Sequence, residues 1–83
     1  MTKQIDEQVE VQARTNRGRL VPILVTWKGK SYTIARVEKT RRHKIKGKKL
    51  DTMLVQVMAP QLMQLELDHY HQSWRLVTIG ETV

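Results

Sequence analysis

Lysine and arginine side chains in one segment, residues 36–49 (RVEKTRRHKIKGKK), offer the clearest chemistry in the sequence. The segment holds eight Lys or Arg residues against one acid, Glu38, so its net charge of +7 equals the formal net charge of the whole chain. Side chains at this density can follow a phosphate backbone and release its counterions. We therefore predict a polyanionic partner, with nucleic acid favoured over ribosomal or membrane-surface anions. The candidate binding residues are Arg36, Lys39, Arg41, Arg42, Lys44, Lys46, Lys48 and Lys49.

A second, smaller positive site is predicted at a hairpin loop around Asn16 and Gly18, two residue types that accept a positive φ at low cost. Arg14, Arg17 and Arg19 surround this loop and would help the larger segment to hold phosphates. Because phosphate contacts carry no sequence information, we expect binding that does not read bases.

Aromatic side chains beside a basic groove are candidates for base stacking. Trp27, Tyr32 and Trp74 lie in stretches of apolar alternation, which favours core packing for all three. Tyr70 has only polar neighbours, so it is the candidate for stacking.

Neither metal binding nor catalysis is predicted. His69 and His71 would share one face of a continuing strand, but a zinc site needs three or four ligands. Glu66 and Asp68 fit the solvent face of an alternating strand better than an acid–base pair. The sequence has no phosphate-binding glycine loop, no dinucleotide motif and no Ser adjacent to a His–carboxylate pair. We expect a non-enzyme with no cofactor and no small-molecule substrate.

Strands must position these residues, because apolar residues recur with a period of two in six stretches. The stretches are residues 9–13, 20–28, 32–37, 51–58, 62–68 and 74–79. Their short connections predict an all-β fold, a six-stranded antiparallel meander. One flat sheet would leave an apolar face in water, so we expect the meander to curl into a small barrel or half-barrel.

Three irregularities are predicted within these strands. The spacing from Ile34 to Val37 is three instead of two, which indicates a β-bulge near Ala35–Arg36. The same slip separates Leu76 from Ile79. Pro22 cannot donate to a ladder and marks an edge or an irregularity. Two bulged strands favour a strongly curved or closed sheet.

The 83 residues are enough for one domain. We expect residues 1–7 to be disordered and residues 8–80 to form a single β domain with a basic hairpin loop at 39–49. The absence of cysteine fits a reducing compartment, and no apolar run approaches the roughly 18–20 residues of a membrane span. We therefore expect a cytoplasmic protein without membrane insertion.

Several of these positions follow a recognisable pattern: WKGKSYTI at 27–34, then Val37, LELD at 65–68 and WRL at 74–76. In this spacing the chain resembles a small bacterial all-β domain of unknown function that is associated with genes for Y-family-type DNA repair polymerases. The resemblance spans roughly residues 8–79 and implies the β fold and a connection with DNA metabolism. Where that family has an aromatic segment of mixed charge after the third strand, this chain has its Lys/Arg run.

Two functions follow from these patterns. The first is a nucleic-acid-binding accessory module that holds DNA or RNA by its phosphates. The alternative is a protein-interaction or assembly module, in which exposed strand edges pair with another chain or a second copy and the basic loop docks an acidic partner. A protein partner retained after nuclease treatment would favour the alternative.

Overall fold

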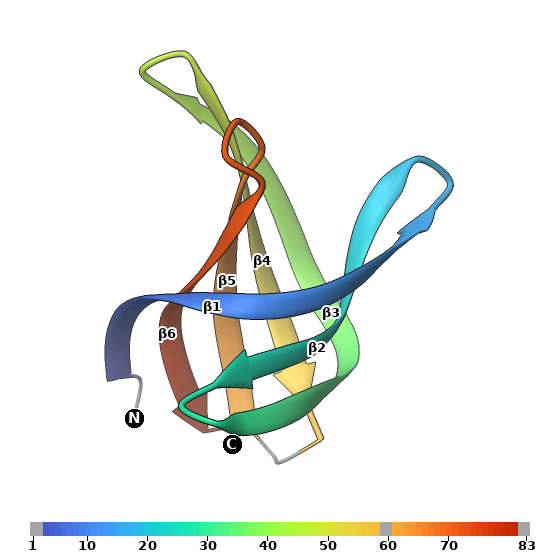
Figure 1. Cartoon of the computed structure of the whole chain (residues 1–83), viewed down its shortest axis with the longest axis vertical. Helices are drawn as coiled ribbons and strands as arrows, with labels where there is room; N and C mark the ends of the chain where they lie inside the picture. The colour runs from blue at the N-terminus through green and yellow to red at the C-terminus, as the bar shows by residue number, and fades with distance from the viewer. Residues whose placement is uncertain (1–2, 59–60, 82–83) are drawn as a thin grey trace.

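The computed structural model describes residues 3–58 and 61–81, in which six antiparallel strands close into a small barrel (Figure 1). Each strand pairs with its neighbour in sequence, and the first closes against the last. This confirms the predicted all-β meander and, of the two expected shapes, shows the barrel. The strands are β1 (Lys3–Asn16), β2 (Arg19–Trp27), β3 (Lys30–Ile45), β4 (Lys48–Val57), β5 (Gln61–Asp68) and β6 (Ser73–Glu81).

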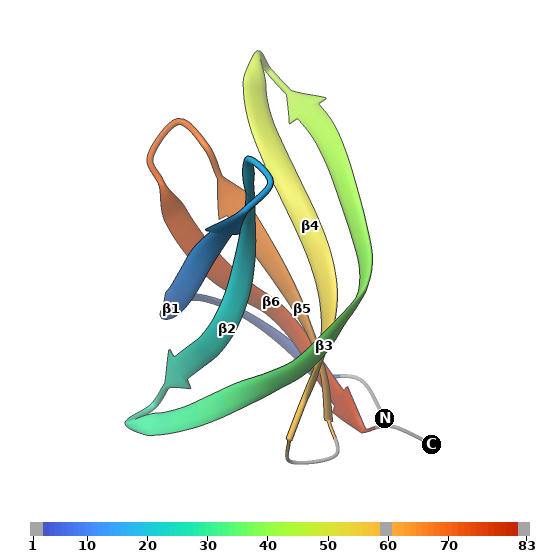
Figure 2. The same ribbon diagram turned by 90° about the vertical axis from the view of Figure 1, so that its right-hand side faces the viewer.

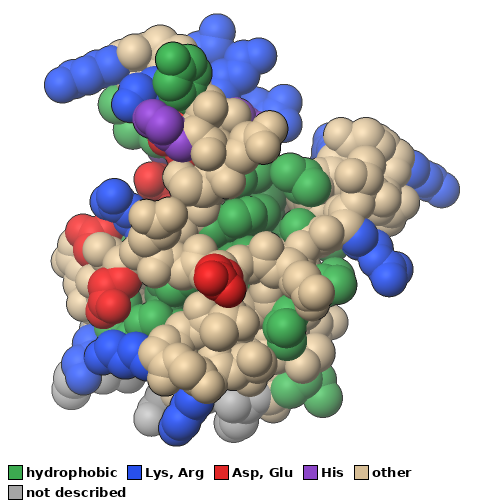
Figure 3. Space-filling model, in the orientation of Figure 1, with side chains coloured by type: hydrophobic (Ala, Val, Ile, Leu, Met, Phe, Trp, Pro, Cys, Tyr) green, Lys and Arg blue, Asp and Glu red, His purple; other side chains and the backbone are tan. Residues whose placement is uncertain are grey.

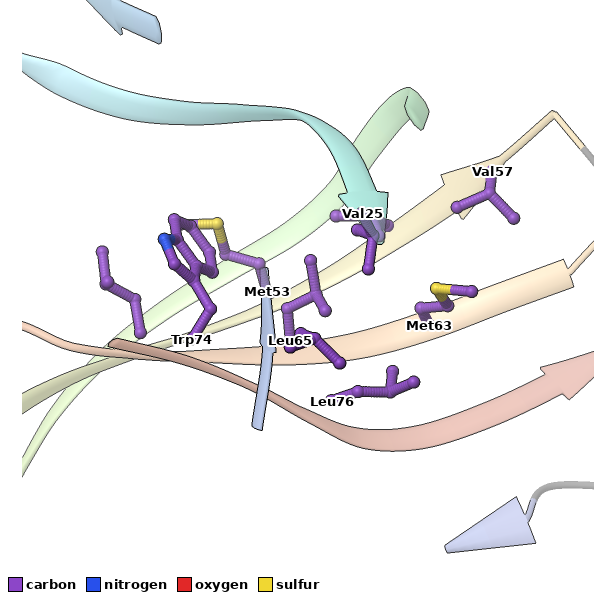
Figure 4. Packing of buried hydrophobic residues seen from close by; sticks show 10 residues of the cluster. Val25, Met53, Val57, Met63, Leu65, Trp74 and Leu76 are labelled. Carbon is purple, nitrogen blue, oxygen red and sulfur yellow. The ribbon is translucent and has the colours of Figure 1, made fainter. Parts of the chain in front are cut away.

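Alternation along the strands fills the barrel interior. Figure 4 shows side chains from β2, β4, β5 and β6 pointing into the same interior. Burying each of these side chains contributes about 1.5–3 kcal/mol relative to exposure. Trp74 belongs to this core, as predicted, while Trp27 and Tyr32 are half-buried and pack against it. The core consists of Val9, Val25, Met53, Val55, Val57, Met63, Leu65, Leu67, Trp74 and Leu76.

Both predicted bulges are present and help to curve the sheet. In β3 the register with β4 shifts between Ile34 and Arg36, and again between Val37 and Lys39. In β6, Leu76 and Thr78 face consecutive residues of β5, so Val77 is the extra residue. Since bulges increase local twist and bend the strand, they favour the closure of a sheet of only six strands.

Pro22 lies at the irregularity that its missing donor predicts. It faces Ala13 beside a register shift in the β1–β2 pair. Towards β3, β2 pairs only through Leu24–Trp27, so the segment from Arg19 to Ile23 has no ladder partner on that side. The barrel wall is therefore open between β2 and β3 at this end.

The structure corrects the expected disordered segment 1–7, because β1 begins at Lys3 and its first residues pair with β6. Closing the barrel gives β6 a second partner, which is β1 from Lys3 to Val9. The register shift between Gln4 and Glu7, with Asp6 at φ 58°, interrupts the period of two and hides the strand in the sequence. Residues 1–2 lie outside the described part.

The structure also corrects the expected basic loop at 39–49. The β3–β4 ladder continues to the pair Ile45–Lys48, and only Lys46 and Gly47 form the turn. Both have positive φ, 51° and 79°, as a two-residue hairpin turn of the I′ kind requires. The basic segment is therefore a two-stranded arm with cations along both strands.

Alternating strand directions bring three turns to one end of the barrel (Figures 1 and 2). They are Arg17–Gly18 between β1 and β2, Lys46–Gly47 between β3 and β4, and residues 69–72 between β5 and β6. We call this the three-turn end. The start of β1, the end of β6 and the Lys28–Gly29 turn lie at the opposite end.

Candidate nucleic-acid interface

The three-turn end gathers most of the predicted binding residues. Arg14, Arg17 and Arg19 come from the β1–β2 hairpin, and the others come from the β3–β4 arm. All eleven predicted side chains are exposed. Figure 3 shows Lys and Arg projecting from the tips of both hairpins. Arg36 is the exception in position, because it pairs with Gln56 well below the tip of the arm.

Strand alternation divides the cations of the β3–β4 arm between two faces. Arg42 stands opposite Asp51 and Lys44 opposite Lys49, on the side that continues into the barrel interior. Arg41 stands opposite Thr52, on the outer side. The predicted residues therefore do not form one surface, and residues adjacent in sequence lie on opposite faces of the arm.

Most of these cations are available to a partner. In the described residues 3–58 and 61–81, Arg36 pairs with Glu38 and Arg42 with Asp51, while the other nine predicted residues make no ion pair. Lys44 and Lys49 even stand directly opposite each other, an arrangement that destabilises a β ladder. A bound anion would relieve that repulsion.

Asp51 is a buried acid, 5% exposed, held between β3 and the β5–β6 turn. Arg42 Nε donates to its Oδ1 at 3.0 Å, and His69 Nε2 donates to its Oδ2 at 2.8 Å. Burial raises the pKa of Asp51, but the hydrogen bonds and positive charges of Arg42 and His69 outweigh this, so the pKa lies below its ordinary value. The same carboxylate raises the pKa of Arg42.

Asp68, the acid of the β5–β6 turn, is also occupied. Its carboxylate accepts from His71 Nδ1 at 2.8 Å and from the backbone N–H of Tyr70 at 2.9 Å. The hydrogen bond from His71 is the main reason that the pKa of Asp68 is lowered. Asp51 and Asp68 are therefore both bound to groups of the protein itself, which weakens their opposition to the field of the free cations.

A cleft of about 570 Å³ opens where β2 and β3 separate. Its lining is apolar below, from β2, β3 and β4, and polar at the rim, where Arg19, Arg42 and His69 lie. Hydrophobic side chains are visible in the recess between the raised β3–β4 arm and the β1–β2 tip in Figure 3. The cleft is lined by Gly18, Arg19, Leu20, Val21, Pro22, Val37, Thr40, Arg42, Asp51, Met53 and His69.

Sequence reasoning missed the group formed by Asp51, Arg42 and His69. His69 and His71 would share a face only in a continuing strand; both lie in the β5–β6 turn, and each bonds a different carboxylate. A signal was present, because Asp51 occupies the inward phase of β4, in line with Met53 and Val55. An acid at an inward position implies a buried partner.

The remaining candidates are placed as follows. Tyr70 is 78% exposed on the β5–β6 turn, with its ring edge-on to His71 at 4.9 Å between centroids. Across residues 3–58 and 61–81, no three His, Asp or Glu side chains gather in an arrangement that could hold a metal ion.

Comparisons with protein-family models, curated proteins and solved structures gave no match to this chain. The described part of the chain contains no helix long and apolar enough to cross a membrane.

Proposed function

We propose that this barrel is a non-enzymatic module that binds nucleic acid by its phosphates at the three-turn end. The observation that carries the proposal is the set of unpaired cations on two hairpins at that end, beside acids already engaged by Arg42, His69 and His71. The opposed pair Lys44–Lys49 supports it, because phosphate is the kind of group that would offset their repulsion. The resemblance to a domain associated with DNA repair polymerase genes agrees with DNA as the ligand, in the cytoplasm.

Phosphate contacts do not depend on base sequence, so the proposal is for binding with little sequence preference. If four to six of these cations contact phosphates, log affinity for duplex should fall against log salt with a slope of about −4 to −5. Fluorescence anisotropy with labelled single-stranded and duplex oligonucleotides across a salt series measures this slope.

A matched pair of triple variants locates the contacts. Arg41→Glu, Lys44→Glu and Lys46→Glu together reverse three charges on the arm and leave Arg42 to Asp51. The control reverses Lys3, Lys28 and Lys30, which lie at the opposite end and change the net charge equally. The arm variant should lose binding and shrink the salt slope by about 3, while the control keeps most of its affinity. Equal losses in the two variants would refute a localised interface.

The alternative of a protein-interaction module draws on one observation, the unpaired ladder edges of β2 and β3 beside the cleft. Pro22 weakens that edge as a template for another strand, because proline supplies no donor. Pull-down from nuclease-treated lysate separates the two functions: a protein partner retained after nuclease supports the alternative.

A further inference from the structure

The cleft between β2 and β3 has the character of a binding site for one small, partly apolar group. Its volume of about 570 Å³ lies within the roughly 300–1,000 Å³ typical of small-molecule sites. Leu20, Val37 and Met53 supply apolar surface, and Arg19, Arg42, Asp51 and His69 supply the charged and polar part of the lining. Such a lining suits a flat ring with a negatively charged group attached.

The guanidinium of Arg42 is oriented at the rim of the cleft before any ligand binds. Its Nε is bonded to Asp51, which is in turn bonded to His69, so the guanidinium plane is fixed. The side chain is nevertheless 64% exposed, which leaves its other N–H groups free to meet a ligand. A guanidinium oriented in advance binds phosphate with two parallel hydrogen bonds and loses less entropy on binding.

Arg19, on β2, lines the other side of the same cleft. The site therefore has cations on both walls and apolar side chains between them. Its one carboxylate, Asp51, is buried and bonded to Arg42 and His69, so it repels an anion weakly.

We propose that this cleft receives an unpaired nucleobase, with the adjoining phosphate bound by Arg42 and Arg19. The inference deepens the proposed function and rests on it: the barrel prefers single-stranded nucleic acid, or unpaired positions, over continuous duplex. A base in a duplex is stacked and paired, so it cannot enter a cleft without being flipped out, whereas a base in a single strand is free to do so.

A peptide strand is a poorer occupant. Pro22 interrupts the donors of the β2 edge, and charged side chains such as Lys39 and Arg41 along β3 are of the kind that discourages pairing by another strand. The cationic rim favours a ligand that carries a charge beside each ring, as a nucleotide chain does.

Thr40→Trp tests the inference because Thr40 lines the cleft, is exposed and carries no charge. The indole should fill the cleft without altering the phosphate contacts. Thr33→Trp is the control, since Thr33 is an exposed residue of the same strand outside the cleft. Anisotropy with labelled oligothymidine and with a duplex of equal length gives the readout, and circular dichroism checks folding.

Thr40→Trp should weaken oligothymidine binding by about 5- to 100-fold, the range expected when one stacked base is lost, and should leave duplex binding within about twofold. Equal oligothymidine affinity in Thr40→Trp and Thr33→Trp would overturn the cleft inference while the phosphate interface stands. Failure of the wild-type protein to bind any oligonucleotide would overturn both. Competition by oligoglutamate as strong as by oligothymidine would overturn the inference in favour of a carboxylate chain.

A second measurement uses the wild-type protein and needs no substitution. Thymidine monophosphate added to the wild-type protein should shift the ring-proton NMR signals of His69, which lines the cleft, more than those of His71, which does not. Signals of His69 that stay fixed at saturating nucleotide would overturn the inference.

Discussion

Arg42 and Asp51 face each other across the β3–β4 ladder, with Arg42 Nε donating to Asp51 Oδ1 at 3.0 Å. The contact joins an exposed cation to a buried acid, so it links binding to folding. Asp51 also accepts from His69, which ties the β5–β6 turn to the arm. The position of Arg42 at the cleft rim therefore depends on a carboxylate that a ligand would not need to touch.

Asp51→Asn should lower the free energy of unfolding by about 1–3 kcal/mol, because the amide cannot accept from both Arg42 and His69 as the carboxylate does. Urea denaturation followed by tryptophan fluorescence measures the loss. Asp68→Asn is the control and should cost less, since Asp68 bonds only groups of its own turn. An unchanged midpoint in Asp51→Asn would show that the contact adds nothing to stability.

Stability should fall in acid. Burial raises the pKa of Asp51, yet Arg42 and His69 bring it below its ordinary value, and His71 lowers the pKa of Asp68. Each carboxyl therefore binds its proton less readily in the folded state than in the unfolded state. The resulting stability is complete above the unfolded pKa, about 4, and is lost as pH falls through the lower folded pKa. The contribution of these two carboxyls to the urea midpoint should therefore be constant from about pH 5 to 7. The midpoint should decline below about pH 4, and less steeply in Asp51→Asn.

Leu65→Ala should destabilise the barrel by about 2–5 kcal/mol, because Leu65 is fully buried and its removal leaves a cavity. A domain this small has a small free energy of unfolding, so the variant should unfold at a far lower urea concentration than the wild type. Leu54→Ala is the matched control on the outer phase of β4, where the side chain is only half-buried. Equal costs at the two positions would contradict the assigned inside and outside of the sheet.

Lys46→Asn should separate stability from binding. Lys46 holds a positive φ of 51°, which costs a lysine about 1 kcal/mol and an asparagine less, so the variant should be slightly more stable. It should also bind oligonucleotides more weakly, because it removes a cation from the tip of the arm. Lys28→Asn, at φ 52° in the turn at the opposite end, should leave affinity unchanged. Loss of affinity in both variants would argue for a diffuse charge effect.

The strands and their bulges could be predicted because burial of one face imposes a pattern on the sequence. Leu65 and Leu67 alternate with polar residues, and the spacing from Ile34 to Val37 revealed the bulge in β3. The strand character of 39–45 left no such pattern, because both faces of the projecting arm carry exposed polar side chains. The contact of Asp51 with His69 joins β4 to the β5–β6 turn, 18 residues further along the chain, and is not encoded in local spacing.

The start of β1 and the end of β6 pair with each other at the end of the barrel away from the cationic turns. A tag, a sensor surface or a larger polypeptide joined at either terminus would therefore leave the arm and the cleft facing outward. A barrel attached through its termini would keep the three-turn end accessible to a nucleic-acid strand.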